Sequence, residues 1–143
     1  MRILVADDDP EYLTSLSRLL TGWGFDVVTA ENGAEAWAVL RQEDAPTLAI
    51  LDWLMPEMDG CEVCRRMRES KGSLLPYILL MTGNCQREEI LKVLVVGADD
   101  YLLKPFEPLD LKMRIRTAMR ILNLQAELAS HSDVQTAVAR STM

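Results

Sequence analysis

The fold of this chain is decided by the stretch Leu48-Ala49-Ile50-Leu51-Asp52-Trp53-Leu54-Met55-Pro56. Its four leading apolar residues show no polar alternation, which is typical of a strand buried on both faces. Strands of this kind occur in parallel sheets that helices cover on either side. Asp52 follows directly, so the stretch predicts a central strand of an α/β protein with a carboxylate at its carboxyl end.

Similar apolar runs, alternating with segments of helical periodicity, extend on both sides of this stretch. The other predicted strands are Ile3–Ala6, Phe25–Thr29, Tyr77–Met81 and Tyr101–Leu103. The predicted helices are approximately Glu11–Thr21, Ala34–Arg41, Cys61–Glu69, Arg87–Val96 and Pro108–Ser130, with Asp59 as the N-cap of the third. Because strand and helix alternate throughout, we expect a five-stranded parallel sheet with right-handed crossovers and helices on both faces.

The composition narrows the class of protein. The chain has 143 residues, 49% of them hydrophobic, which predicts one domain with a proper core. A net charge of −7 argues against nucleic acid as a partner of this chain. No run approaches the roughly 18 apolar residues of a membrane span, and the N-terminus lacks a signal-peptide pattern. We therefore expect a cytoplasmic protein that binds no membrane.

Chemically active side chains follow the predicted strands. In an open parallel sheet, ligands bind beyond the carboxyl ends of the strands. The residues found there are Asp7, Asp8 and Asp9 after the first run, Asp52 after the third, Thr82 and Gly83 after the fourth, and Lys104 and Pro105 after the fifth. Acids, a hydroxyl group and an amine are thus expected at one edge of the sheet.

The acids at this edge have the character of a Mg²⁺ site. Mg²⁺ takes hard oxygen ligands and keeps several waters. We expect Asp8 and Asp52 as direct ligands, with Asp7 binding through water. Asp9 with Pro10 is explained by the start of the following helix, where acids and proline are favoured.

The same edge could support phosphoryl transfer. The Asp52 carboxylate can act as a nucleophile and form an aspartyl phosphate. Because the carboxylate and the transferred group are both negative, cations must lie beside them, and Lys104 would supply one in addition to Mg²⁺. Thr82 can donate a hydrogen bond to a phosphoryl oxygen, and Gly83 leaves room for close approach. A cis bond at Lys104–Pro105 would aim the lysine into the crevice, and the sequence permits one.

The three cysteines favour a reduced, intracellular protein. Cys61 and Cys64 form a C-x-x-C pattern that could be redox-active or metal-binding. The simpler interpretation is two helical residues one turn apart. A zinc site would need further ligands, and the sole histidine, His131, lies in the tail.

These motifs together resemble the response-regulator receiver domain of two-component signalling. The resemblance covers about residues 1–122 and rests on Ile3-Leu4-Val5-Ala6-Asp7-Asp8, Asp52-x-x-Met55-Pro56-x-Met58-Asp59-Gly60, Met81-Thr82-Gly83 and Tyr101-x-x-Lys104-Pro105-Phe106. It implies a flavodoxin-like sheet of order 2-1-3-4-5. It also implies a switch that catalyses only its own phosphorylation and dephosphorylation, and is otherwise not an enzyme.

The resemblance assigns roles to individual residues. It implies phosphotransfer to Asp52 from a sensor histidine kinase or a phosphotransfer protein. Mg²⁺ would be held by Asp7, Asp8, Asp52 and the backbone carbonyl of Leu54. The phosphoryl group would be bound by Thr82, Gly83 and Lys104, with Tyr101 as the switch aromatic that turns inward as Thr82 moves. Pro56, Gly60 and Pro105 would have structural roles.

The last predicted helix is longer than a bare receiver domain needs. Its first apolar stripe is Leu111, Ile115, Ala118 and Leu122, and a second is Ile121, Leu124 and Leu128. The second stripe has the spacing of a coiled-coil seam, which favours a homodimer or a linker to an output domain beyond the C-terminus. We expect residues 123–143 to be a helix extension followed, from Ser130, by a frayed polar tail or linker.

Three other interpretations remain open on the sequence. Asp7 and Asp9 have the D-x-D spacing of a haloacid-dehalogenase-like Mg²⁺ phosphatase, although this leaves Asp52 unexplained. A flavodoxin-like FMN carrier would need a phosphate-binding loop where the three acids lie. A degenerate receiver that signals without phosphate would not need the full set of site residues.

Overall fold

The computed structural model describes residues 1–71, 75–83, 91–92 and 95–141, with the backbone alone from 131. The predicted helix over Arg87–Val96 falls mostly outside these residues, and Cys85 falls outside them entirely.

The described residues contain the predicted sheet. Its strands are β1 (Arg2–Ala6), β2 (Asp26–Ala30), β3 (Leu48–Asp52), β4 (Tyr77–Thr82) and β5 (Asp100–Leu103). They are all parallel and lie in the order β2-β1-β3-β4-β5, which confirms the implied topology. β3 is buried along its whole length, as its uninterrupted apolar sequence predicted.

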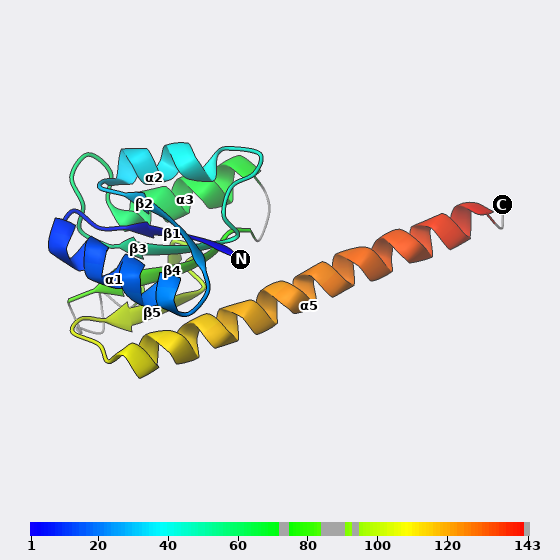
Figure 1. Ribbon diagram of the computed structural model, residues 1–143. Coiled ribbons are helices and arrows are strands. Elements are labelled where there is room, and N and C mark those ends of the chain that lie inside the picture. Colours follow the sequence, from blue (N-terminus) through cyan, green and yellow to red (C-terminus); the bar gives the residue numbers. More distant parts are fainter. Residues whose placement is uncertain (72–74, 84–90, 93–94, 142–143) are drawn as a thin grey trace.

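Helices cover both faces of the sheet. They are α1 (Pro10–Gly22), α2 (Gly33–Leu40), α3 (Gly60–Lys71) and α5 (Pro108–Ser141). Figure 1 shows α2 and α3 on one face, and α1 with the first half of α5 on the other. Successive strand residues point to opposite faces, so Val5 and Ile50 pack toward α1 and α5, whereas Leu4 and Leu51 pack toward α2 and α3.

The helix starts are set by side chains that cap free backbone N–H groups. Asp9 caps α1, with its Oδ1 accepting from the backbone of Glu11 at 3.1 Å and of Tyr12 at 3.4 Å. Asp59 accepts from the backbone of Glu62 at 2.8 Å, which confirms it as the cap of α3. Each cap lies just beyond a strand carboxyl end, so the helices begin close to the predicted site.

Gly60 permits a close backbone contact behind Asp52. A Cβ added at Gly60 would lie 2.5 Å from the backbone oxygen of Asp52 and 3.0 Å from the Leu80 side chain. The Gly60 N–H also donates to the Trp53 carbonyl at 2.8 Å. The start of α3 is thereby held directly against the end of β3.

The last helix ends later than the sequence predicted. A helix to about Ser130 followed by a frayed tail or linker was expected, but α5 continues to Ser141. The stretch after Ser130 is polar yet contains no glycine or proline, and its alanines favour helix. Small and polar residues therefore did not end the helix. Figure 1 shows α5 projecting well past the domain.

The two cysteines of the C-x-x-C pattern, Cys61 and Cys64, both lie within α3, one turn apart. Cys64 is buried, its thiol contacts the Val96 carbonyl at 3.5 Å, and burial raises its pKa to about 11. A thiol that stays protonated, such as that of Cys64, is a poor nucleophile and a poor ligand. The simpler interpretation of the pattern, two helical residues one turn apart, is confirmed by their place in α3. None of the described helices has both the length and the apolar character of a membrane span.

The contact at Gly60 predicts a large loss of stability on substitution. Gly60→Ala should lower the free energy of unfolding by about 2–4 kcal/mol, because the new Cβ overlaps the Asp52 carbonyl. Gly22→Ala is the matched control, since a Cβ there meets nothing within 4 Å at the end of α1. Urea unfolding of both variants tests this. Equal midpoints for the two would contradict the proposed close approach.

Candidate functional site

Three carboxylates from two strand ends converge at the carboxyl edge of the sheet. Asp7 and Asp8 follow β1, and Asp52 ends β3. One oxygen from each of the three lies within 4.8 Å of the others. Asp7 is 1% exposed and Asp52 is 9% exposed, whereas Asp8 faces solvent. Hard oxygen donors grouped at this spacing fit a small divalent cation such as Mg²⁺.

Lys104 supplies the positive charge within this cluster. Its Nζ lies 2.8 Å from Asp7 Oδ2 and 3.2 Å from Asp52 Oδ1. The Lys104 side chain is 23% exposed, so much of this ion pairing is shielded from water. The predicted meeting of lysine and acids is therefore present, and the Lys104–Pro105 bond is cis.

Asp7 is held by two further constraints. Its Oδ1 accepts from the backbone of Asp9 at 3.0 Å, while its Oδ2 is bound to Lys104. Asp9 itself is turned away to cap α1 and is not part of the acidic cluster found among the described residues. The three consecutive acids thus divide into two at the site and one at the helix start.

Thr82, Gly83 and Tyr101 lie on the neighbouring strands β4 and β5. Thr82 ends β4, is buried, and its carbonyl accepts from the backbone of Lys104 at 2.7 Å. Gly83 follows it and is exposed, with open space where a Cβ would be. Tyr101 is half-buried in β5 and packs against the core that faces α2 and α3. This hydrogen bond ties the loop that carries Lys104 directly to the end of β4.

The loop after β3 carries the remaining predicted residues. Leu54 is 76% exposed, and Pro56 lies in the turn that leads to Gly60. The Trp53 backbone donates to the Met81 carbonyl at 2.9 Å, which ties the start of this loop to β4.

The electrostatics of Asp52 follow from this crowding. Burial raises the pKa of Asp52 to about 6, with the charges of Asp7 and Asp8 acting in the same direction. Lys104 opposes both effects. The metal-free site thus carries more negative charge than its lysine compensates, which is the condition under which a divalent cation binds.

Sequence reasoning missed Tyr12. Its ring lies beside Lys104, with the ammonium nitrogen 4.2 Å from the ring centroid. Burial, and then the charges of Asp7 and Asp52, raise the pKa of Tyr12 above its ordinary value. Its place in the first turn of α1, three residues after the Asp9 cap, was the signal that could have located it.

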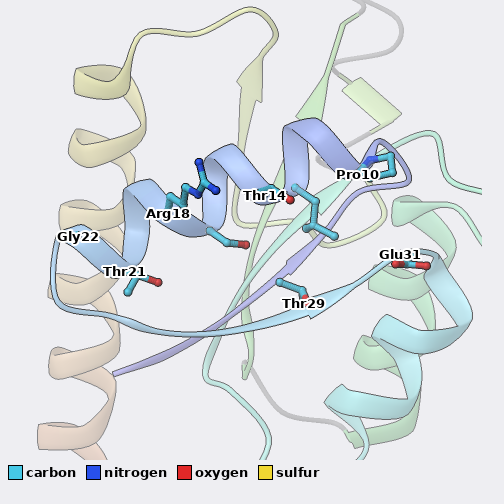
Figure 2. A pocket seen from close by; sticks show the side chains of 9 residues that line it. Pro10, Thr14, Arg18, Thr21, Gly22, Thr29 and Glu31 are labelled. Carbon is cyan, nitrogen blue, oxygen red and sulfur yellow. The ribbon is translucent and has the colours of Figure 1, made fainter.

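The main hollows lie elsewhere. Figure 2 shows one of about 700 Å³ between α1 and β2, lined by Thr14, Arg18, Thr29 and Glu31 among others. Another, of about 420 Å³, adjoins the site at Trp53, Leu54 and Thr82. Asp7, Asp8 and Asp52 line neither of these two hollows. The candidate site is therefore identified by its grouped charges and their distances, not by the size of a cavity.

Comparison with known proteins places these features in a family. The family model described as "Response regulator receiver domain" matches residues 3–116. The DNA-binding response regulator MtrA of Mycolicibacterium smegmatis is 38% identical over 135 residues, covering 94% of this chain and 58% of that protein. A probable transcriptional regulator, ycf27, of Pyropia yezoensis is 43% identical over 121 residues, covering 83% and 47%.

A solved structure agrees. The CheY-like response regulator receiver domain protein of Methanospirillum hungatei superposes with a TM-score of 0.78 at 29% identity, covering 87% of this chain and 97% of that one. In contrast, the chain spans about half the length of the curated relatives it matches.

The raised pKa of Asp52 predicts a pH-dependent stability. The folded pKa of about 6 lies above the ordinary 3.8, so the folded state holds the proton more tightly. Stability should therefore fall as pH rises from about 4 to 6, and the full penalty should remain above pH 6. In EDTA at pH 7, Asp52→Asn should be more stable than wild type by about 1–3 kcal/mol. The difference should vanish near pH 4.

Urea unfolding between pH 4 and 8 measures this difference. Asp59→Asn is the control, because it changes an acid of the same loop that lies outside the carboxylate cluster. A constant difference between Asp52→Asn and wild type across this range would contradict the burial of a crowded carboxylate.

Proposed function

The chain belongs to the response regulator receiver family of two-component signalling, and on that premise we propose that Asp52 accepts a phosphoryl group from a sensor histidine kinase or a phosphotransfer protein. A receiver domain is a phospho-accepting switch rather than a true enzyme. The observation that carries the proposal is the contact of Lys104 with both Asp7 and Asp52 at the end of the sheet.

The transfer itself is a displacement at phosphorus. A carboxylate oxygen of Asp52 forms the new P–O bond as the P–N bond of the phosphohistidine breaks. The phosphohistidine ring is already protonated on its other nitrogen, so the imidazole leaves as a neutral group. The buried position of Asp52 limits the directions from which a donor can approach. Lys104 lies within reach of that oxygen and neutralises charge that gathers on the phosphoryl group.

The chain's own residues would hold Mg²⁺. We assign it to Asp7, Asp8, Asp52 and the backbone carbonyl of Leu54, where it supplies positive charge to the phosphoryl oxygens. Both oxygens of Asp7 already accept hydrogen bonds, from Asp9 and Lys104, which favours contact with the metal through water. Asp8 is exposed and free to turn toward the ion.

The switch would involve Thr82, Gly83 and Tyr101. Thr82 ends the strand next to Asp52 and could donate its hydroxyl to a phosphoryl oxygen, while exposed Gly83 would let that oxygen approach the backbone. Tyr101 is half-buried, so it has an inward position available when Thr82 moves. The new dianionic group would bias this two-state equilibrium.

The phosphatase alternative finds little support in the geometry. It needs Asp9 as the general acid, but Asp9 Oδ1 is occupied by two backbone N–H groups at the start of α1. It also leaves Asp52 and Lys104 without a role, although they contact each other.

We divide the chain into a receiver domain, residues 1–122, and an extension, residues 123–143. Leu124 is 51% exposed and Leu128 is 67% exposed on the projecting part of α5. A hollow of about 570 Å³, lined by Leu75, Leu122 and Leu128 among others, adjoins them. Exposed leucines at this spacing favour pairing with a second copy or continuation into an output domain. The longer relatives are a DNA-binding response regulator and a probable transcriptional regulator.

The proposed chemistry predicts a specific mass change. Incubation with phosphoramidate and Mg²⁺ should add about one phosphoryl group to the wild-type protein, because the nucleophile and its cations are together. Intact-mass spectrometry measures the addition. Asp52→Asn and Mg²⁺-free samples should show none, whereas Asp9→Asn should behave as wild type. Labelling that survives Asp52→Asn but is lost in Asp7→Asn would support the phosphatase instead.

The extension predicts a change in assembly. If α5 pairs with a second copy, Leu124→Glu with Leu128→Glu should shift a concentration-dependent dimer to monomer in analytical ultracentrifugation. The dimer would lose four buried leucines, two from each copy, each worth about 2 kcal/mol, so the dimer constant should weaken by roughly a millionfold. Leu109→Glu with Met113→Glu is the control, since both are exposed nearer the start of α5. Dissociation by the control pair alone would place the interface on the first half of the helix.

A further inference from the structure

Lys104 has a third neighbour besides its two carboxylates. The face of the Tyr12 ring lies 4.2 Å from Nζ, measured to the ring centroid. The ammonium group is therefore bounded by Asp7, by Asp52 and by an aromatic face. A cation over an aromatic ring is attracted by the ring quadrupole, most strongly where water is partly excluded. The Lys104 side chain is mostly shielded from water, so this cation–π contact is stronger than one at an exposed site.

The ring is itself braced from two sides. Tyr12 packs against the core between the sheet and the helices α1 and α5. Phe106, two residues after Lys104, meets it edge to face with the centroids 6.1 Å apart. The Tyr12 backbone is fixed by the Asp9 cap. A rigid ring on α1 thus faces a flexible lysine on the loop after β5.

We propose that Tyr12 is a positioning residue whose aromatic face holds the Lys104 ammonium at the phosphorylation site. A lysine side chain is a flexible four-carbon stem with a strongly hydrated ammonium group. Unless a neighbouring group confines it, it samples many conformations. The ring removes the positions that lead away from Asp52 and leaves the ammonium between the acids. The aromatic face, and not the hydroxyl group, performs this role.

The inference rests on the proposed function for its kinetic consequence. If Asp52 accepts a phosphoryl group, Lys104 must leave its contact with the carboxylate and bind phosphoryl oxygens a short distance away. A lysine that is already confined loses less entropy in that step. The rate of phosphorylation should therefore depend on the Tyr12 ring through Lys104.

The first test reads the contact directly and does not depend on phosphorylation. Protons above an aromatic face resonate upfield, so the Lys104 side-chain methylene signals next to Nζ should be shifted upfield in wild type. The shift should persist in Tyr12→Phe, which keeps the ring, and disappear in Tyr12→Leu. Lys104 signals at the same position in all three proteins would overturn the proposal.

The second test separates positioning from simple packing. With phosphoramidate and Mg²⁺, Tyr12→Leu should slow phosphorylation by about three- to thirtyfold, and Tyr12→Phe should stay within about twofold. In a Lys104→Met background, Tyr12→Leu should have no further effect. The same loss in both backgrounds would show that the ring matters only for packing and would overturn the proposal.

A matched control exists at the other end of the same helix. Trp23 is the C-cap of α1, is packed on the same core, and lies under Lys112 with Nζ 5.5 Å from the ring centroid. Trp23→Leu thus removes an aromatic–lysine pair and similar packing away from the acids, and should leave the rate unchanged. If wild type itself gains no phosphoryl group, the proposed function fails, while the lysine signals still decide the role of Tyr12.

Discussion

The structure depends on bringing like charges together at the end of a parallel sheet. Asp7 and Asp52 are buried beside each other, and Asp8 adds a third negative charge within 4.8 Å. Folding must oppose this repulsion, and Lys104 alone among the groups described at the site contributes a positive charge to do so. Three carboxylates and one ammonium group leave the site with a net negative charge. That imbalance costs stability in the metal-free protein and supplies the affinity for a cation.

Backbone hydrogen bonds keep this unfavourable arrangement in register. The Lys104 backbone is bound to Thr82, the Trp53 backbone to Met81, and the Gly60 backbone to Trp53. Each of these bonds joins a loop that carries site residues to a strand end or to the start of a helix. A displacement at Asp52 would therefore be felt at Thr82 through covalent and hydrogen-bonded neighbours, without any need for a long pathway. This coupling is the physical content of the proposed switch.

The sequence predicted the sheet and the carboxylate cluster well because both are encoded locally. Runs such as Leu48–Leu51 are typical of strands buried on both faces, and the residues directly after parallel strands meet at one edge of the sheet. The Tyr12 ring was not predicted, because it lies inside α1 and not directly after a strand, where the rule for the sheet edge applies. The end of α5 was also misjudged. The polar residues after Ser130 indicate only that this segment is exposed, and an exposed segment can be either helix or coil.

The helix α5 runs from one end of the sheet past the other. It starts at Pro108, four residues after Lys104, and so begins at the same end of the sheet as the carboxylates. Its later residue Leu128 lines a hollow with Met1, Thr47 and Leu75, all of which precede strands and lie at the opposite end of the sheet. A helix of 34 residues is about 51 Å long, roughly three times the length of a five-residue strand. Because a continuous helix is stiff, a shift of the loop after β5 would also move the exposed leucines at its far end. An output domain or a second copy attached there would read the state of Asp52 without touching it.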